Sequence, residues 1–215
     1  MAFNPFVINI GRQLGAGGRT IGHRLAETLQ ARYYDKEILS LAASESGFSP
    51  EFFERSDERK SFFRSFFGTI APVIGADFYN HQLSDENLFN HISSAIRKES
   101  QQHSCVFIGR CADYILRDHP RHVNIFIAAD TEDRAQRMMK EQGLSHKNAI
   151  KIIEQGDANR ADFYNFYSNK TWGMATTYDL CINSSVLGLE ETFQIILDFV
   201  VKKLQLEHHL TRTAE

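Results

Sequence analysis

The stretch FVINIGRQLGAGGRT, residues 6–20, carries the strongest fold signal in this chain. Residues 6–10 are apolar or β-branched apart from one asparagine, which is typical of a strand buried in a parallel sheet. A glycine-rich loop follows, and Ile21, Leu25 and Leu29 then recur at helical spacing. The order strand, glycine loop, helix brings successive backbone N–H groups and a helix N-terminus to one point, which is an arrangement that binds phosphate.

The loop, residues 11–20, departs from the usual phosphate-loop pattern, which ends in Gly-Lys-Ser/Thr. One alignment sets Gly18-Arg19-Thr20 against that ending, and another sets residues 15–18, Gly-Ala-Gly-Gly, against Gly-Ala-Gly-Lys. Both alignments leave the Thr20 hydroxyl as the candidate magnesium ligand. Arginine is not a neutral replacement for lysine, because its planar fork binds phosphate oxygens in a different geometry. The sequence therefore predicts a phosphate site and leaves altered or lost activity open.

A dinucleotide-binding fingerprint is the main alternative for the same loop. Gly15 and Gly17 match its first two glycines, and the acidic Asp35 follows about twenty residues later. The third glycine of the fingerprint would fall at Thr20, and the loop before Gly15 is wider than the tight turn of that motif. An ordinary glycine-rich turn is the remaining interpretation.

The rest of the chain predicts one α/β domain. Four later runs have strand character, namely residues 32–34, 106–108, 123–127 and 180–182, and residues 193–204 form the clearest amphipathic helix. Strands that alternate with helices predict a parallel sheet covered on both faces. Residues 38–102 lack a convincing strand and carry paired phenylalanines, for which packing is the simplest role, so we expect a helical insertion there.

Composition limits the class of protein. A chain of 215 residues with 42% hydrophobic and 24% charged residues suits a single globular domain. A net charge of −3 excludes an overall basic field for nucleic acid or an anionic membrane. We find no signal-peptide pattern and no apolar run of membrane-spanning length, so we expect a cytoplasmic protein. Its three cysteines lack Cys-x-x-Cys spacing, and those in strand runs are expected to be buried.

Several charged residues lie where the predicted sheet would place a ligand. Arg110 follows the run 106–108, at the carboxyl edge where parallel sheets bind ligands, although it could simply close a surface turn. Asp35 follows the run 32–34 and is expected either to support magnesium or a phosphate acceptor, or to cap the next helix. Arg134 and Arg137 are most simply a charged helix face, although such a helix could bring one of them to a nucleotide.

Residues 157–160, Asp-Ala-Asn-Arg, precede an aromatic and polar run that ends at Trp172. Asp157 and Arg160 are candidates for a mobile segment that closes over phosphates, and a solvated helix end is the alternative. We place this predicted lid at about residues 155–175.

Three segments together resemble the cytidylate kinase-like family of P-loop kinases. Residues 12–22 are similar to that family's variant phosphate loop, in which Gly-Gly-Arg replaces the usual lysine ending. Residues 108–116 resemble its third strand and the Gly-Arg that follows, although Cys111 stands where cytidylate kinases have aspartate. Residues 157–161 resemble its lid helix. The resemblance covers most of the chain and implies five parallel strands, a helical insertion over the monophosphate, and a lid over ATP.

The resemblance also implies a function, which is ATP-dependent phosphoryl transfer to a nucleoside monophosphate, with CMP or dCMP as the first candidates. Magnesium would be supported by Thr20 and Asp35, and charge on the phosphates would be neutralised by Arg19, Arg110 and Arg160. The expected catalytic residues are Arg110, Asp35, Arg160 and Asp157, and the expected nucleotide-binding residues are Arg12, Gly15, Ala16, Gly17, Gly18, Arg19 and Thr20. A nucleotide-binding regulatory protein with this fold and little catalysis is the second hypothesis, favoured by the missing lysine. The oligomeric state stays open.

Overall fold

The computed structural model describes residues 4–46 and 85–206. Five strands, all parallel to their neighbours, form one sheet in the order β2-β3-β1-β4-β5. The strands are β1 (Val7–Arg12), β2 (Arg32–Tyr34), β3 (Cys105–Ile108), β4 (His122–Ala128) and β5 (Leu180–Asn183). Since β3 lies between β2 and β1, the order differs from the 3-2-1-4-5-6 arrangement of the dinucleotide-binding fold.

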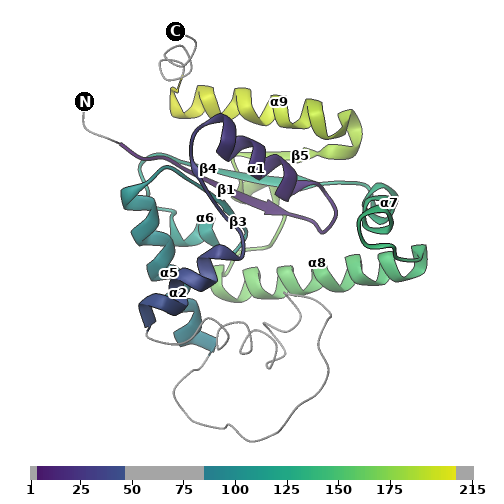
Figure 1. Ribbon diagram of the computed structural model, residues 1–215, viewed down its shortest axis with the longest axis horizontal. Helices are drawn as coiled ribbons and strands as arrows, with labels where there is room; N and C mark the ends of the chain where they lie inside the picture. Colours follow the sequence, from purple (N-terminus) through teal and green to yellow (C-terminus); the bar gives the residue numbers. More distant parts are fainter. Residues whose placement is uncertain (1–3, 47–84, 207–215) are drawn as a thin grey trace, which may run out of the picture.

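Helices cover both faces of this sheet and make three layers (Figure 1). They are α1 (Gly18–Thr28), α2 (Glu37–Ser46), α5 (Asp85–Gln102), α6 (Ala112–Ile115), α7 (Thr131–Gln142), α8 (His146–Ser168) and α9 (Ser184–Leu204), with a short 3-10 turn at Ala175–Thr177. In Figure 1, α1 and α9 lie above the sheet, and α2, α5, α6 and α8 lie below it. The predicted three-layer α/β/α fold with a five-stranded parallel sheet is therefore confirmed.

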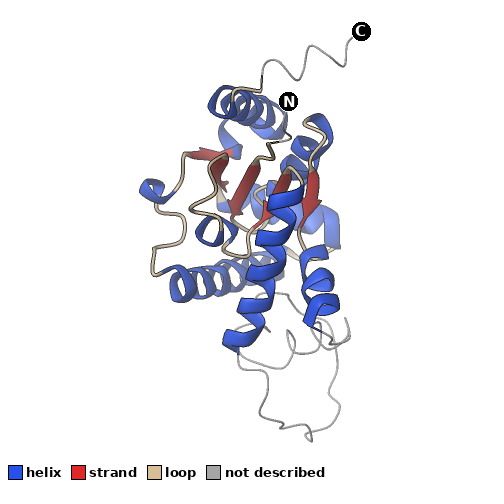
Figure 2. Ribbon diagram, turned by 90° about the vertical axis from the view of Figure 1, so that its left-hand side faces the viewer, coloured by secondary structure: helices blue, strands red, loops and turns tan. Residues whose placement is uncertain are grey.

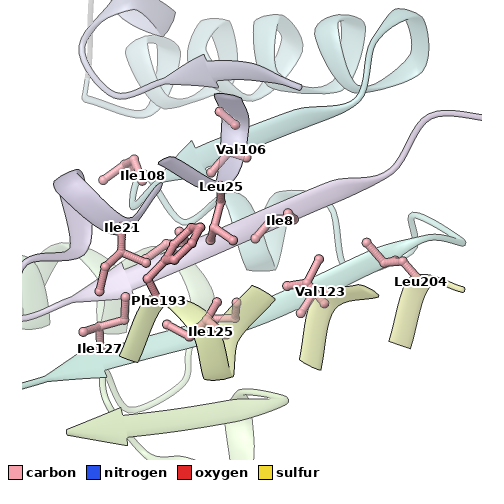
Figure 3. Close-up of a cluster of buried hydrophobic side chains, with 14 of the residues drawn as sticks. Ile8, Ile21, Leu25, Val106, Ile108, Val123, Ile125, Ile127, Phe193 and Leu204 are labelled. Atoms are coloured by element: carbon pink, nitrogen blue, oxygen red, sulfur yellow. The ribbon is translucent and has the colours of Figure 1, made fainter. Parts of the chain in front are cut away.

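The face toward α1 and α9 is packed with aliphatic side chains (Figure 3). Every second strand residue points there, including Ile8 and Ile10 of β1 and Val106 and Ile108 of β3, all at most 1% exposed. Ile21 and Leu25 of α1 and Phe193, Ile196 and Val200 of α9 fill the space above them. The side chains on one face of α1 and α9 thus pack on alternate side chains of the strands, in a layer of apolar residues. This packing fixes the position of the loop between β1 and α1.

The opposite face is a second core with more polar and aromatic residues. Phe107 of β3 stacks on Tyr34 of β2, with ring centroids 5.3 Å apart, and both pack against α2, α5 and the C-terminal half of α8. Figure 2 shows these helices as a separate layer beside the sheet. A third, smaller cluster joins α7 to α8 through Ala135, Met138, Ala149 and Ile153.

The predicted elements agree closely with the observed ones. Each of the five predicted strand runs lies in or overlaps an observed strand. The last helix spans Ser184–Leu204 and is kinked at Gly188, whose φ angle is 80°, so the predicted residues 193–204 lie in the part after the kink. Cys105 is buried in β3 as expected, but Cys181 is exposed because β5 is an edge strand packed less completely than the others.

Two predictions concern parts of the chain that the structure describes only partly. α2 and α5 are helices at the two ends of the predicted insertion, and its paired phenylalanines lie outside the described residues. The insertion over residues 38–102 stays a prediction. In the described ranges we find no helix long and apolar enough to cross a membrane.

Candidate active site

The loop between β1 and α1 presents unpaired backbone donors. Gly15 and Gly17 have φ angles of 78° and 82°, a left-handed conformation that glycine adopts without the cost of a Cβ. The N–H groups of Gly15, Gly17, Gly18, Arg19 and Thr20 donate to no acceptor within the described residues. The first turn of α1 also contains no acidic side chain. The loop is therefore a set of positive dipoles without a partner, which suits an anion.

The carbonyl side of the loop, in contrast, is braced. The Leu14 carbonyl accepts a hydrogen bond from Arg134 Nη1 at 3.4 Å, and the Gly15 carbonyl accepts one from Arg137 Nη1 at 3.0 Å. The Ala16 carbonyl accepts from Ser184 Oγ at 2.9 Å, from the first residue of α9. Because three consecutive carbonyls are held outward by α7 and α9, the loop amides stay oriented toward the opposite side.

Asp157 ties α8 to this loop. Its Oδ1 accepts the N–H of Leu14 at 2.7 Å, and its two oxygens pair with Arg134 at 2.5 Å and with Arg160 at 3.3 Å. Arg134 is 5% exposed and Arg160 8% exposed. The interpretation of Arg134 as part of a charged, solvated helix face is therefore wrong, since it is buried beneath the loop.

Asp35 lies at the end of β2 and faces two arginines of the loop region. Its Oδ2 is 2.7 Å from Arg19 Nε, and its Oδ1 is 3.5 Å from Arg12 Nη2. Asp35 is 7% exposed, whereas the side chain of Arg19 is 61% exposed. The carboxylate thus holds the guanidinium groups of Arg12 and Arg19 beside the loop.

A left-handed turn follows β3. Gly109, Arg110 and Cys111 have φ angles of 70°, 61° and 54°, of which the last two each cost about 1–2 kcal/mol for a residue with a Cβ. Arg110 is 3% exposed, so its guanidinium does not close a surface turn but lies inside the molecule. Such a turn folds the chain back sharply, and it places Arg110 at the carboxyl edge of the sheet next to β1.

A pocket opens between the ends of β1 and β3 and the C-terminal half of α8. Its lining combines arginines with aromatic and polar groups: Asn9, Ile10, Gly11, Arg12, Gly109, Arg110, Cys111, Asp113, Arg160, Phe163, Tyr164, Trp172 and Tyr178. Inside it, Tyr164 donates its hydroxyl to Asp113 Oδ2 at 2.6 Å. Burial raises the pKa of Asp113, although the Tyr164 hydrogen bond opposes this shift. The cavity measures about 20 Å³, room for a water molecule but not for a nucleotide.

Electrostatics at this pocket favour an anion. Burial, together with the nearby positive charge of Arg160, lowers the pKa of Arg12 to about 9. Burial also lowers the pKa of Arg160, where the charge of Asp157 acts in the opposite direction. The charged arginines are therefore held at a free-energy cost, and a polyanionic ligand between them would reduce that cost.

The structure brings most of the predicted site residues together. Arg12, Arg110 and Arg160 line one pocket, and Asp35 and Arg19 lie beside it. Thr20 is exposed at the start of α1, next to the free amides. Asp157 holds the loop and two arginines, which is the geometry of a positioning residue. The roles assigned to these residues stay predictions.

Sequence reasoning missed residues that bond to the loop carbonyls, such as Ser184, and the polar residues inside the pocket. Ser184 carries no motif, and its contact with the Ala16 carbonyl joins segments 168 residues apart in the chain. Asp113 and Tyr164 belong to different helices, so their pairing has no local signature.

Comparison with known proteins agrees with this geometry. A model of the cytidylate kinase-like family matches residues 7–186 of the chain. The cytidylate kinase of Pyrococcus horikoshii is 25% identical over 198 residues, which cover 91% of this chain and 88% of that protein.

Solved structures show the same fold. An uncharacterized protein from Eubacterium ventriosum superposes with a TM-score of 0.68 at 25% identity, over 91% of this chain and 98% of that one. Shikimate kinase from Bacteroides thetaiotaomicron superposes with a TM-score of 0.53 at 12% identity, over 94% and 99% of the two chains, which shows a shared fold alone.

Proposed function

The chain belongs to the cytidylate kinase-like family, and we propose that it transfers the γ-phosphoryl group of ATP to a nucleoside monophosphate, with CMP or dCMP as the first acceptors. Family membership indicates a phosphotransferase, and the choice of acceptor is our proposal. The observation that carries it is the gathering of Arg12, Arg110 and Arg160 around one pocket, beside a loop of free amides. Arginines beside free backbone amides suit phosphoryl transfer, because its transition state spreads negative charge over the equatorial oxygens.

The donor phosphates would lie on the loop. The amides of residues 17–20 and the N-terminus of α1 would bind the β-phosphate, and Arg19, held by Asp35, would reach the γ-phosphate from the exposed side. The braces from Arg137 and Ser184 keep those amides fixed before ATP arrives, so that little reorganisation is needed on binding.

Magnesium fits Thr20 better than Asp35. The Thr20 hydroxyl is exposed next to the loop amides, whereas both oxygens of Asp35 already face arginines. The described ranges hold no group of three or more His, Cys, Asp or Glu side chains that could bind a metal by themselves. This is compatible with Mg²⁺, which is commonly held by substrate phosphates, water and one or two protein oxygens. Bound there, the ion would neutralise charge between the β- and γ-phosphates.

The acceptor would occupy the pocket at the ends of β1 and β3. Arg110 would bind its phosphate, while Trp172 and Tyr178 offer surfaces for a base and Asp113 offers a hydrogen-bond acceptor. A pocket for a ligand of this size holds about 300 Å³ or more, so the cavity of about 20 Å³ must widen by movement of its walls. α8 is the wall that carries Arg160. We propose that α8 moves outward to admit the acceptor and that its movement back excludes water from the site.

The chemical step needs no general base from the protein. An oxygen of the acceptor's phosphate, already ionised near neutral pH, attacks the γ-phosphorus, and the bond from that phosphorus to the β–γ bridging oxygen breaks. The bridging oxygen leaves on ADP, and the acceptor becomes a nucleoside diphosphate. Arg160 and Arg110 would stabilise the charge on the transferring group during this exchange.

A second candidate function is nucleotide binding with little catalysis. Gly18 stands where one alignment expects the phosphate-loop lysine, and this absence favours a regulatory protein.

A coupled ADP-release assay separates the two functions. Purified protein, ATP and Mg²⁺ are tested with a panel of nucleoside monophosphates, and we expect ADP formation that depends on CMP or dCMP. ATP binding by calorimetry without ADP formation across the panel would support the regulatory function. Stabilisation by NAD rather than ATP in a thermal-shift experiment would reopen the dinucleotide interpretation.

A further inference from the structure

The phosphate loop lacks a side chain at the position next to its free amides. Gly18 is the first residue of α1, so any side chain there would leave the helix beside the phosphate-binding amides. In the usual loop a lysine at this point reaches the terminal phosphates. The space that such a side chain would enter is filled by another residue of this chain.

Arg12 occupies that space. A Cβ added at Gly18 would lie 2.7 Å from Arg12 Cβ and 2.8 Å from Arg12 Cγ, closer than real Cβ atoms approach. The Arg12 side chain then runs to the end of β3, where a Cβ on Gly109 would collide with Arg12 Nη1. The arginine leaves the last position of β1, passes Gly18 and ends at Gly109. Residue 18 must be glycine for this course, whereas at residue 109 the contact is with the flexible end of the arginine, and glycine is favoured there by the φ angle of 70°.

The guanidinium group of Arg12 is buried and lies among other charged groups. Arg12 is 7% exposed, and its Nη2 lies 3.5 Å from one oxygen of Asp35, whose other oxygen is bound more closely by Arg19. Arg12 and Arg160 line the same pocket. Within the described residues, Arg12 thus shares the carboxylate of Asp35 with Arg19, and the charge of Arg160 adds to the positive charge around it.

We infer that Arg12 supplies the phosphate-binding cation that the loop lacks at residue 18, contacting the terminal phosphates of ATP from the strand side of the loop. The inference rests on the proposed function for its catalytic part and stands on ATP binding without it. The cation would come from the strand end of the loop and not from its helix end, with the stem of Arg12 against Gly18 and its guanidinium at Gly109, in the pocket that Arg110 and Arg160 also line.

An exchange experiment tests this inference. Arg12→Ala should weaken ATP binding about tenfold in calorimetry and lower kcat about a hundredfold, as expected for one charged phosphate donor. Gly18→Lys alone should also impair the protein, because its side chain meets Arg12. The double variant Arg12→Gly/Gly18→Lys leaves no Cβ at residue 12 to meet the new side chain and returns a cation from the helix side. It should recover at least tenfold of the activity lost in Arg12→Gly alone, together with ATP affinity.

Controls separate charge from folding. Arg117→Ala removes an exposed arginine away from the loop and should leave both readouts unchanged, and thermal unfolding of every variant checks that it is folded. If Arg12→Ala does not fold, Arg12→Gln replaces it, because glutamine keeps much of the side-chain length without the charge.

The outcomes are distinct from those of the proposed function. An Arg12→Ala protein that binds ATP as the unaltered chain does overturns the inference, as does a double variant Arg12→Gly/Gly18→Lys no better than Arg12→Gly. A chain that makes no ADP with any acceptor ends the proposed kinase function, while the ATP affinities of the same variants still decide the role of Arg12.

Discussion

The two faces of the central sheet are made by alternate residues of the same strands, yet they bury different chemistry. Toward α1 and α9 the strands present Ile8, Ile10, Ile125 and similar aliphatic residues in a closed layer. Toward α2, α5, α6 and α8 they present Asn9 and Phe107, and the pocket with its arginines and tyrosines opens at that side's carboxyl edge.

The difference teaches how one sheet separates stability from chemistry. The aliphatic layer contributes most through buried apolar area, and its residues have no polar atoms to satisfy. The other face holds charges at a free-energy cost, which only a ligand or a specific partner offsets. Substitutions on the two faces should therefore affect different measurements.

The largest effect should come from the aliphatic layer. Ile125→Ala, at a side chain with 0% exposure, should lower the free energy of unfolding by about 2–5 kcal/mol, because it removes buried methylene groups and leaves a cavity. Urea denaturation measures this loss, and turnover per folded molecule should stay unchanged. Ile195→Ala, at a residue 40% exposed on α9, is the matched control and should cost far less. Equal losses at both positions would contradict the comparison.

Arg160→Ala should show the opposite pattern. We expect kcat to fall about a hundredfold, equivalent to about 2.7 kcal/mol in the activation barrier, since one preorganised charge donor is lost. Stability should change little, because Asp157 keeps Arg134 and the Leu14 N–H as partners. Steady-state kinetics with the acceptor found in the ADP-release screen checks this. Unchanged turnover would remove Arg160 from the mechanism.

Asp113→Asn should give the smallest effect, and one that depends on pH. Burial raises the pKa of Asp113 in the folded protein, so between the unfolded and folded pKa values the folded state binds more protons. The charged carboxylate therefore lowers stability as pH rises through that range, and asparagine lacks this penalty. Asparagine can still accept from Tyr164.

Denaturation of both proteins across pH tests this sign. Their stabilities should converge at the acid end, with the asparagine variant gaining an advantage as pH rises. An advantage that is the same at every pH would show that the titration of Asp113 is not its source.

Much of the fold was predictable because its signals are local. The apolar run before Gly11, the glycine loop and the spacing of Ile21 and Leu25 determine strand, turn and helix from neighbouring residues alone. Pocket residues such as Arg110 were predicted because parallel strands share a carboxyl edge.

What could not be predicted depends on contacts between distant segments. The burial of Arg134 follows from the packing of α7 beneath the loop, where Gly15 lets the two backbones approach. The left-handed conformation of Arg110 and Cys111 is likewise imposed by surroundings, since their residue types do not favour it. The exposure of Cys181 followed from strand order, which a hydrophobic run does not reveal.

The course of Arg12 between Gly18 and Gly109 has a consequence for how this family can diverge. Residues 12 and 18 share one volume, so neither can change alone without a collision or a lost cation. A relative with lysine at position 18 should carry glycine at position 12, because any Cβ at position 12 would still meet that of residue 18. Glycine at position 109 should persist in both forms, since its φ angle of 70° favours glycine. Positions 12 and 18 should therefore covary across homologous sequences, with few viable intermediates between the two forms.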